Sequence, residues 1–266
     1  MSQTDRKLLV TTSWDDGHPL DLRLAELLEK YGIAATFYIP RKNGHAVLSE
    51  EQIVELSRRF EIGAHTLDHV YLDRVSDAQA SEQLSGSRRW IEDVTGKSCR
   101  IFCFPAGKYR NHQLSLVSKA GFAAARTAEL LSVQPPRREA GLFLVPTTVQ
   151  VFPHRPYAYA KNALKRHKPA PLLWSGALFR SKDWTALARH LFSRALGERG
   201  VFHLWGHSWE IEQQSQWRTL EDLLAMVAEH RQELRFVTNG ELCGCFASAR
   251  ETESIPSHAG CAPEVK

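Results

Sequence analysis

The sequence lacks the features of a membrane protein, a nucleic-acid binder or a disulfide-stabilised protein. No apolar stretch approaches the ~18 residues that a membrane helix needs, and the opening MSQTDRKLLV has no long apolar segment or cleavage site of a secretory signal. No Lys/Arg run is interleaved with aromatic residues, and the net charge of +4 is small for 266 residues. The five cysteines include no CxxC pair, which favours reduced thiols. We therefore expect a cytoplasmic protein with no transmembrane segment and no nucleic-acid partner.

Acidic residues are absent from one long region, between Ala140 and Lys182. Seven basic residues occur there: Arg155, Lys161, Lys165, Arg166, Lys168, Arg180 and Lys182. Such runs usually mark solvated faces, so the first interpretation is a basic insertion around 153–182. The alternative is a rim that attracts an anionic substrate or a membrane surface carrying acidic lipid.

Short β-rich runs alternate with helical patterns from residue 8 onward, as is typical of a parallel sheet wound with helices. We expect strands at 8–14, 34–40, 61–66, 101–107, 144–152 and 200–207. We expect helices at 20–32, 49–60, 77–95, 112–120, 184–197 and 219–233. A last short strand is expected within 234–242. At 43% hydrophobic residues, the chain fits one α/β domain over 1–247, followed by a disordered polar tail over 248–266.

Two adjacent aspartates follow the first predicted strand. Asp15 and Asp16, in TTSWDDGH, lie at its carboxyl end, where α/β folds place ligands. Side chains alternate along a strand, so the two carboxylates are expected to point in different directions. One of them can then bind a metal ion while the other faces a substrate. Asp-Gly is also a common turn dipeptide, and a simple turn is the alternative interpretation.

A histidine pair follows the third predicted strand. His65 and His69, in IGAHTLDH, are four residues apart. In a helical turn they would lie on one face, where both could bind a single ion.

A further histidine follows the last strong strand. His207, in FHLWGHSWE, comes directly after Gly206, and an imidazole with a pKa near ~6.5 suits proton transfer at neutral pH. His203 is expected within the strand, facing the opposite side or satisfied in the core. Trp205 and Trp209 flank His207, where they could stack on a sugar ring or belong to the core.

The ordered motifs DDG, HTxxH, FPAG and WGH, which span residues 12–207, resemble those of the NodB-type polysaccharide deacetylases of carbohydrate esterase family 4. The resemblance implies a distorted (β/α) barrel that removes N- or O-acetyl groups, chiefly from amino sugars, with the help of a metal ion. It implies that Asp15 is the catalytic base and His207 the catalytic acid. The implied metal ligands are Asp16, His65 and His69. The implied oxyanion and substrate-binding residues are Pro105, Ala106 and Gly107, with the Ala106 N–H directed at the oxyanion, and we add Trp205 and Trp209.

Two family features are missing from this sequence. The arginine expected two residues before Pro105 is Cys103, and the sequence leaves open whether Arg100 or Arg126 replaces it. The fourth motif, which contains a tryptophan, is not evident, although Asp183-Trp184 is a candidate.

We expect a metal-dependent hydrolase that removes an N-acyl group from an amino sugar or sugar conjugate. Zinc fits two imidazoles and a carboxylate, and iron, cobalt, nickel and manganese also fit. The substrate is expected to be an N-acylated sugar or another small amide, and the basic insertion favours an anionic one. The alternatives are hydrolysis of a cyclic imide or ureide on the same site, and a non-catalytic module that binds a glycan or lipid phosphate. The sequence does not determine the oligomeric state.

Overall fold

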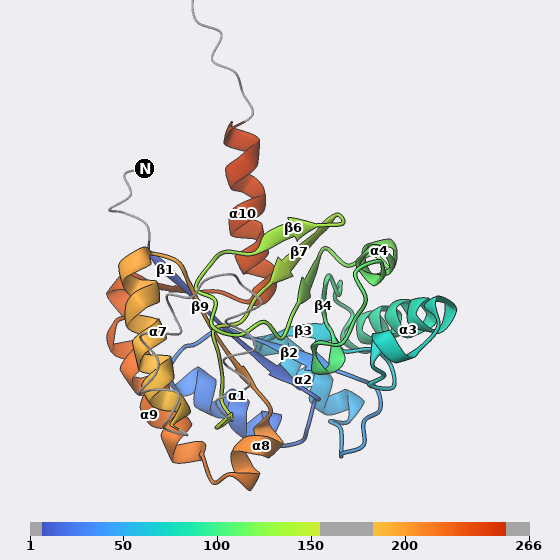
Figure 1. Cartoon of the computed structure of the whole chain (residues 1–266). Coiled ribbons are helices and arrows are strands. Elements are labelled where there is room, and N and C mark those ends of the chain that lie inside the picture. The colour runs from blue at the N-terminus through green and yellow to red at the C-terminus, as the bar shows by residue number, and fades with distance from the viewer. Residues whose placement is uncertain (1–6, 155–182, 254–266) are drawn as a thin grey trace, which may run out of the picture.

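The computed structural model, which describes residues 7–154 and 183–253, contains one curled sheet with helices packed around it (Figure 1). Its described strands are β1 (Leu8–Asp15), β2 (Ala35–Ile39), β3 (Glu61–Ala64), β4 (Ile101–Cys103), β5 (Ala124–Arg126), β6 (Arg137–Glu139), β7 (Leu142–Val145), β8 (Val149–Gln150), β9 (Val201–Gly206) and β10 (Leu234–Phe236). The strand order is β6-β7-β5-β4-β3-β2-β1-β9-β8, with β10 paired to β1. All pairs are parallel except β6 with β7.

The helices follow the strands in the alternation that the sequence predicts. They are α1 (Asp21–Lys30), α2 (Glu50–Arg59), α3 (Asp77–Thr95), α4 (Gln113–Lys119), α7 (Trp184–Glu198), α8 (Ser208–Gln213), α9 (Trp217–Glu229) and α10 (Asn239–Glu253). Short 3₁₀ turns are η2 (Leu72–Arg74), η3 (Pro105–Gly107) and η4 (Arg231–Glu233). The predicted α/β fold, a distorted (β/α) barrel, is confirmed as a curled half-barrel of mostly parallel strands.

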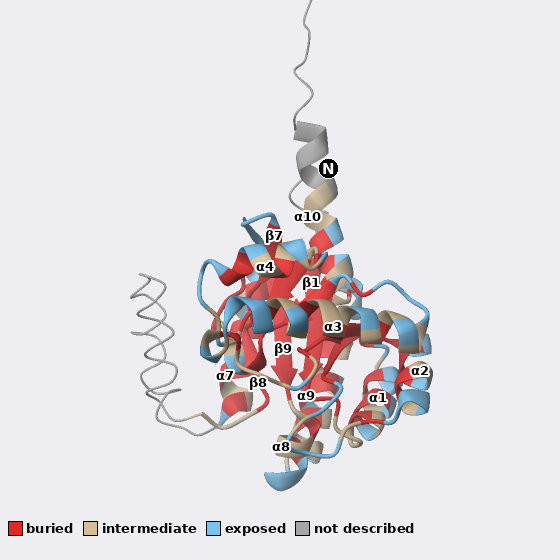
Figure 2. Ribbon diagram, turned by 90° about the vertical axis from the view of Figure 1, so that its right-hand side faces the viewer, coloured by how far each residue is buried: buried red, intermediate tan, exposed pale blue. Residues whose placement is uncertain are grey.

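Two separate sets of buried side chains cover the two faces of the sheet. The larger set lies between the sheet and the surrounding helices and includes Trp14, Phe37 and Phe102. The smaller set lies on the inner, concave face and includes Tyr38 and Cys103. Since side chains alternate along a strand, Asp15 points to the opposite side from Trp14, toward the concave face. Figure 2 shows the central strands as buried, whereas β6 at the edge of the sheet is exposed.

Local sequence signals define several helix ends. Ser49 with Gln52 and Ser76 with Gln79 form capping boxes at the starts of α2 and α3. Gly96, at φ 66°, ends α3 in the left-handed conformation. These caps explain why the predicted boundaries of the two helices agree closely with the observed ones.

The structure differs from the predicted elements in several places. β5 and α8 were not predicted, and the predicted strand 101–107 ends at Cys103, where the turn η3 follows. The predicted strand 144–152 is divided into β7 and β8, and β6 with β7 forms a hairpin that was not predicted. Its two connecting residues, Ala140 and Gly141, both have positive φ angles of 49° and 81°. Ala-Gly is a weak turn signal, so the hairpin is not evident from the sequence.

The carboxyl-terminal region combines the expected short strand with a helix. β10 confirms the last short strand at 234–236, but α10 begins at Asn239 and continues through 248–253, which were expected to be part of a disordered tail. Leu242 and Cys243 are buried against the concave face, and this packing stabilises a helix whose sequence is weakly amphipathic. Residues 254–266 lie outside the described residues.

The basic insertion also lies almost wholly outside the described residues, which end at His154 and resume at Asp183. No helix among the described residues is long and apolar enough to span a membrane.

Candidate active site

The carboxyl ends of five strands meet around one cavity, and the loops that leave them carry the predicted site residues. β1 leads to Asp16, β3 to His65, β4 to η3 and β9 to His207, while β5 ends at Arg126. The cavity has a volume of about 320 Å³. Its lining consists of Asp15, Asp16, Asn43, His45, His65, His69, Tyr71, Ala106, Gly107, Arg126, Trp205, His207 and Trp209. The predicted convergence of three distant motifs at one end of the sheet is therefore found in the structure.

A tight turn places both aspartates at this cavity. Asp15 continues β1, whereas Asp16 has φ 80° and Gly17 has φ 59°, so the backbone reverses immediately. A Cβ at Gly17 would lie 2.6 Å from Cγ2 of Ile39, so only glycine fits. The turn interpretation of Asp-Gly is thus correct, and this turn places the Asp16 carboxylate at the same cavity as that of Asp15.

His65 and His69 do converge, but the predicted helical turn between them is wrong. Residues 65–71 are irregular, with Thr66 at φ 61° and His69 at φ 52° in the left-handed region. The Thr66 hydroxyl accepts a hydrogen bond from the Val70 N–H at 3.0 Å and closes the loop. The imidazole centroids lie 5.0 Å apart. A four-residue spacing can bring two side chains together in a loop as well as in a helix. Here the strained left-handed conformations of Thr66 and His69 do so.

Asp16, His65 and His69 form a donor set for one metal ion. Asp16 Oδ1 lies 3.1 Å from His69 Nε2 and 3.7 Å from His65 Nε2. This oxygen is buried and has no hydrogen-bond partner, as expected of an atom that binds an ion. The other oxygen, Oδ2, accepts a hydrogen bond from Trp209 Nε1 at 2.9 Å. The residues present therefore fit a divalent ion such as zinc, with two imidazoles and one carboxylate.

The tautomer of His65 supports this arrangement. Its Nδ1–H donates to the Cys103 carbonyl at 2.9 Å, which leaves the lone pair of Nε2 directed at Asp16. Burial lowers the pKa of His65 to about 4, so the ring is neutral, the form that binds metals. Burial raises the pKa of Asp16, but the contact with His69 and nearby histidine charge outweigh it, and the net pKa is low.

A second group of donors, Asp15, His65 and Cys103, also lies within 4.8 Å. It fits an ion less well, because burial raises the pKa of the Cys103 thiol well above its usual value. One oxygen of Asp15 is also occupied by Arg126. Asp16, His65 and His69 are therefore the better candidate donor set.

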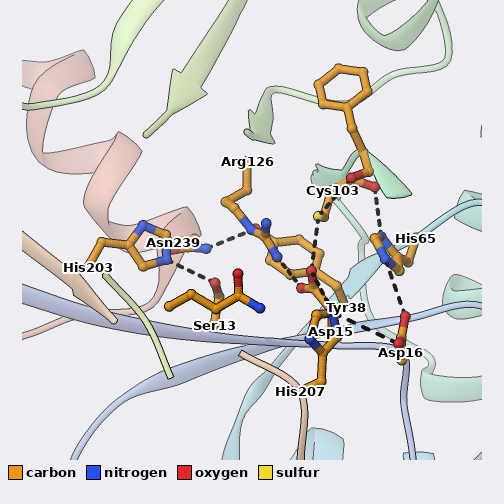
Figure 3. A network of polar contacts seen from close by, with 12 residues as sticks. Ser13, Asp15, Asp16, Tyr38, His65, Cys103, Arg126, His203, His207 and Asn239 are labelled. Carbon is orange, nitrogen blue, oxygen red and sulfur yellow. Dashed lines mark hydrogen bonds and ion pairs between the residues drawn. The ribbon is translucent and has the colours of Figure 1, made fainter. Parts of the chain in front are cut away.

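Asp15 is held on the concave face by an ion pair that the sequence only suggested. Arg126 donates from Nη2 to Asp15 Oδ1, and both side chains are almost completely buried (Figure 3). The Cys103 thiol contacts Asp15 Oδ2 at 3.7 Å. Burial raises the pKa of Asp15, but the charges of Arg126, His65 and His207 hold it below its usual value. Asp15 is therefore an ionised carboxylate whose Oδ2 faces the cavity.

His207 lies opposite the two aspartates, at the start of α8. Its Nε2 is 4.0 Å from Asp15 Oδ2 and 3.9 Å from Asp16 Oδ2. On the other side of the ring, Nδ1–H donates to Glu210 Oε2 at 2.6 Å. Burial lowers the pKa of His207, but the hydrogen bond to Glu210 and the charge of Asp15 raise it to about 9. The contact also fixes the ring so that Nε2 faces the cavity.

His203 is buried inside the barrel, as predicted. Its Nδ1–H donates to the Pro146 carbonyl at 2.9 Å, and its Nε2 lies 2.9 Å from the Ser13 hydroxyl. Burial and the charge of Arg126 lower the pKa of His203 to about 3. Both ring nitrogens are satisfied away from the cavity, so His203 has no site role in this geometry.

The two tryptophans differ from the expected stacking surfaces. The Arg126 guanidinium lies 4.5 Å from the centroid of the buried Trp205 ring and covers one face. Trp209 stacks on His45 at a centroid distance of 4.7 Å and donates to Asp16. Both residues therefore support other site residues, although each also forms part of the cavity wall.

The strand 4 motif forms the turn η3. Pro105 is buried, Ala106 has φ 52°, and a Cβ at Gly107 would meet the Ala128 Cβ at 2.5 Å. The Gly107 N–H bonds to the Phe104 carbonyl. Ala106 precedes it in the same turn, where an N–H has no acceptor within the turn. Ala106 and Gly107 line the cavity, so the geometry is compatible with an oxyanion contact.

The other sequence candidates lie away from the cavity. Asp183 caps α7 through the N–H groups of Thr185 and Ala186, and the Trp184 ring donates to Gln216. Arg100 is exposed at the opposite end of β4. Glu210 was missed, although an acidic residue three positions after a histidine that begins a helix is a readable signal. Asn43, His45 and Tyr71 come from loops with no sequence signal.

The fold and these residues define the class: a (β/α) barrel with a candidate mononuclear metal site, an ionised aspartate and a histidine at one cavity. Residues 2–125 match the family model described as polysaccharide deacetylase. The match includes Asp15, Asp16, His65, His69 and η3, but ends before Arg126 and His207.

Curated relatives agree with this assignment. YxkH of Bacillus subtilis, named for polysaccharide deacetylase activity, is 30% identical over 124 residues, which are 45% of this chain and 44% of that protein. The peptidoglycan deacetylase of Helicobacter pylori is 30% identical over 102 residues, 38% of this chain and 34% of that protein. The chain thus matches less than half the length of each of these relatives.

Solved structures show the same fold. A Mycobacterium smegmatis protein described as a polysaccharide deacetylase has a TM-score of 0.66 at 16% identity, covering 100% of this chain and 98% of that chain. The peptidoglycan deacetylase PdaC of Bacillus subtilis has a TM-score of 0.54 at 16% identity, covering 94% and 96%.

Proposed function

We propose that this protein is a metal-dependent deacetylase that removes the N-acetyl group of an amino sugar or sugar conjugate. The observation that carries the proposal is the buried, unpartnered Oδ1 of Asp16 facing two imidazole nitrogens, in the cavity that also holds Asp15 and His207. A bound divalent ion, most simply zinc, would supply Lewis-acid polarisation of the acyl carbonyl and of the attacking water.

The residues around this position supply the proton transfers. Asp15 is the base: its Oδ2 faces the cavity, while its Oδ1 is engaged by Arg126. It takes a proton from the water that attacks the acyl carbon. In this proposal the Ala106 N–H donates to the oxyanion that develops on the acyl oxygen.

His207 is the acid. Its Nδ1–H is held by Glu210, so the proton that leaves is the one on Nε2, the nitrogen that faces Asp15 and Asp16. An amine leaves only when its nitrogen is protonated, and the high pKa of His207 keeps that proton available at neutral pH.

The same features argue against a module that only binds glycans or lipid phosphates. Neither the Asp15 carboxylate nor the His207 imidazole is needed to hold an ion, yet Asp15 is buried, His207 is partly buried, and each is held by a charged partner. Burying charged pairs costs folding free energy. A chemical role of Asp15 and His207 explains why these pairs are present in spite of this cost.

The function is tested by metal analysis combined with amine release. Purified protein is loaded with zinc, iron, cobalt, nickel or manganese, and free amine is measured with N-acetyl amino sugars and their short oligomers. We expect release that a chelator abolishes and added metal restores. A metal-loaded protein that releases no amine from these sugars but opens cyclic imides or ureides would establish the alternative substrate class. The cytoplasmic location predicted from the sequence stays a prediction.

A further inference from the structure

Arg126 occupies a place in this site that the family resemblance assigns to another position. The resemblance expects an arginine at position 103 on β4, where this chain has Cys103. β4 and β5 are adjacent parallel strands, and Cys103 and Arg126 are direct partners in their register. Adjacent strands lie about 4.8 Å apart and partner side chains share a face. A long side chain on β5 can therefore fill the space that a short one on β4 leaves open.

The guanidinium of Arg126 is fixed on several sides. Its Cζ lies 4.5 Å from the ring centroid of Trp205 and 5.4 Å from that of Tyr38. The Tyr38 hydroxyl in turn accepts a hydrogen bond from Asn239 Nδ2 at 2.9 Å. Arginine suits such a site, because its planar, weakly hydrated cation stacks on aromatic rings and pairs with carboxylates. The side chain is 1% exposed, so its orientation is set by packing.

The contact engages only one oxygen of Asp15. Arg126 donates to Oδ1, while Oδ2 has the thiol of Cys103 at 3.7 Å and His207 Nε2 at 4.0 Å (Figure 3). We propose that Arg126 is the positioning residue that orients Asp15 toward the attacking water, and that it replaces from β5 the arginine missing at position 103. This inference rests on the proposed function.

The experiment compares two replacements of Arg126 with a matched arginine control. Arg126→Met keeps most of the bulk and removes the charged fork, Arg126→Ala leaves a cavity, and Arg100→Ala removes the exposed arginine at the far end of β4. We expect both Arg126 variants to lose about 10²-fold in kcat, the scale of a misplaced reacting group. KM and metal content should stay near wild-type values, because Arg126 contacts none of Asp16, His65 and His69. Arg100→Ala should match wild type.

Chemical rescue separates orientation from packing. Millimolar guanidinium ion should raise kcat of Arg126→Ala at least ~10-fold by entering the vacated space, and should not raise that of Arg126→Met, in which methionine fills it. If Arg126→Ala fails to fold, the kcat and metal content of Arg126→Met test whether Arg126 positions Asp15. Unchanged kcat in a folded variant, loss that follows metal content, or no rescue of folded Arg126→Ala would overturn the inference. A wild-type protein that releases no amine would instead refute the proposed function.

Discussion

His203 and His207 lie four residues apart on one chain segment, and their opposite environments predict opposite consequences of replacement. Consider His203→Gln, which keeps a hydrogen-bonding side chain but cannot titrate. Wild-type His203 has a pKa of about 3 in the folded protein and 6.5 when unperturbed. Below pH 6.5 the unfolded chain therefore binds a proton that the folded protein does not. The contribution of neutral His203 to the free energy of unfolding is therefore fully present above its unperturbed pKa and is lost as the pH falls toward 3.

The magnitude follows from these two pKa values. Between pH 7 and pH 5 the titration of His203 lowers the free energy of unfolding by about 2 kcal/mol, and each further pH unit costs about 1.4 kcal/mol until the folded form is protonated. In a protein of this size, 2 kcal/mol corresponds to roughly 4–8 °C in Tm. His203→Gln should be less stable than wild type at pH 7 but should lose about 2 kcal/mol less on going to pH 5.

The assay is denaturant unfolding of metal-free protein at pH 5, 6 and 7, followed by far-UV circular dichroism. Removing the metal ion makes the contribution of His65 the same in both proteins, so it cancels in the difference. His190→Gln is the matched control, since His190 is exposed on α7 and its imidazole stays in water on folding. Parallel stability curves for wild type and His203→Gln would refute the assignment of His203 as a buried neutral histidine.

The remaining predictions concern the site itself. Asp16→Ala, His65→Ala and His69→Ala should each remove most of the bound metal in elemental analysis, because each residue supplies one of three donors. Full metal content in one of these variants would exclude the replaced residue as a metal ligand. Asp15→Asn should keep its metal and lose ~10²–10⁴-fold in kcat, the usual contribution of a general base. If it lost the metal instead, the roles of the two aspartates would be exchanged. His207→Ala should impair N-acetyl amide hydrolysis far more than hydrolysis of an activated acetate ester, whose leaving group needs no proton. Equal losses on both substrates would contradict its role as acid.

The sequence predicts most of the sheet and the position of the site for a physical reason. Parallel strands with crossover helices all bring their carboxyl ends to one edge, so side chains that follow them must gather there. This argument needs only the strand pattern and places Asp15, His65 and His207 together. It does not supply the loop conformations. The helical turn expected for His65 and His69 is absent, because Thr66 and His69 adopt the left-handed conformation and the Thr66 hydroxyl closes the loop on the Val70 N–H.

The features that the sequence misses share a different cause. The hairpin of β6 and β7 has no turn residues of high propensity, and α10 is stabilised by packing against the concave face. The burial of β7 and of Leu242 and Cys243 in α10 outweighs local propensity, and a sequence pattern does not record this burial. The predicted boundary at 247 stays a prediction, and α10 extends from Asn239 to Glu253.

The supporting contacts of the site illustrate the limit of reading motifs along a chain. Asp15 and His207 each need an oppositely charged partner once buried, because an unpaired buried charge is costly. Arg126 lies on β5 rather than at the expected position 103, and Glu210 lies on α8, three residues after His207. A barrel interior allows this exchange, because side chains from neighbouring strands and from the next helical turn reach the same space. Position 103 carries a cysteine instead of the motif arginine, but the positive charge is still present in the site because Arg126 supplies it. Charged side chains therefore have to be compared by their positions in the structure as well as by their positions in the sequence.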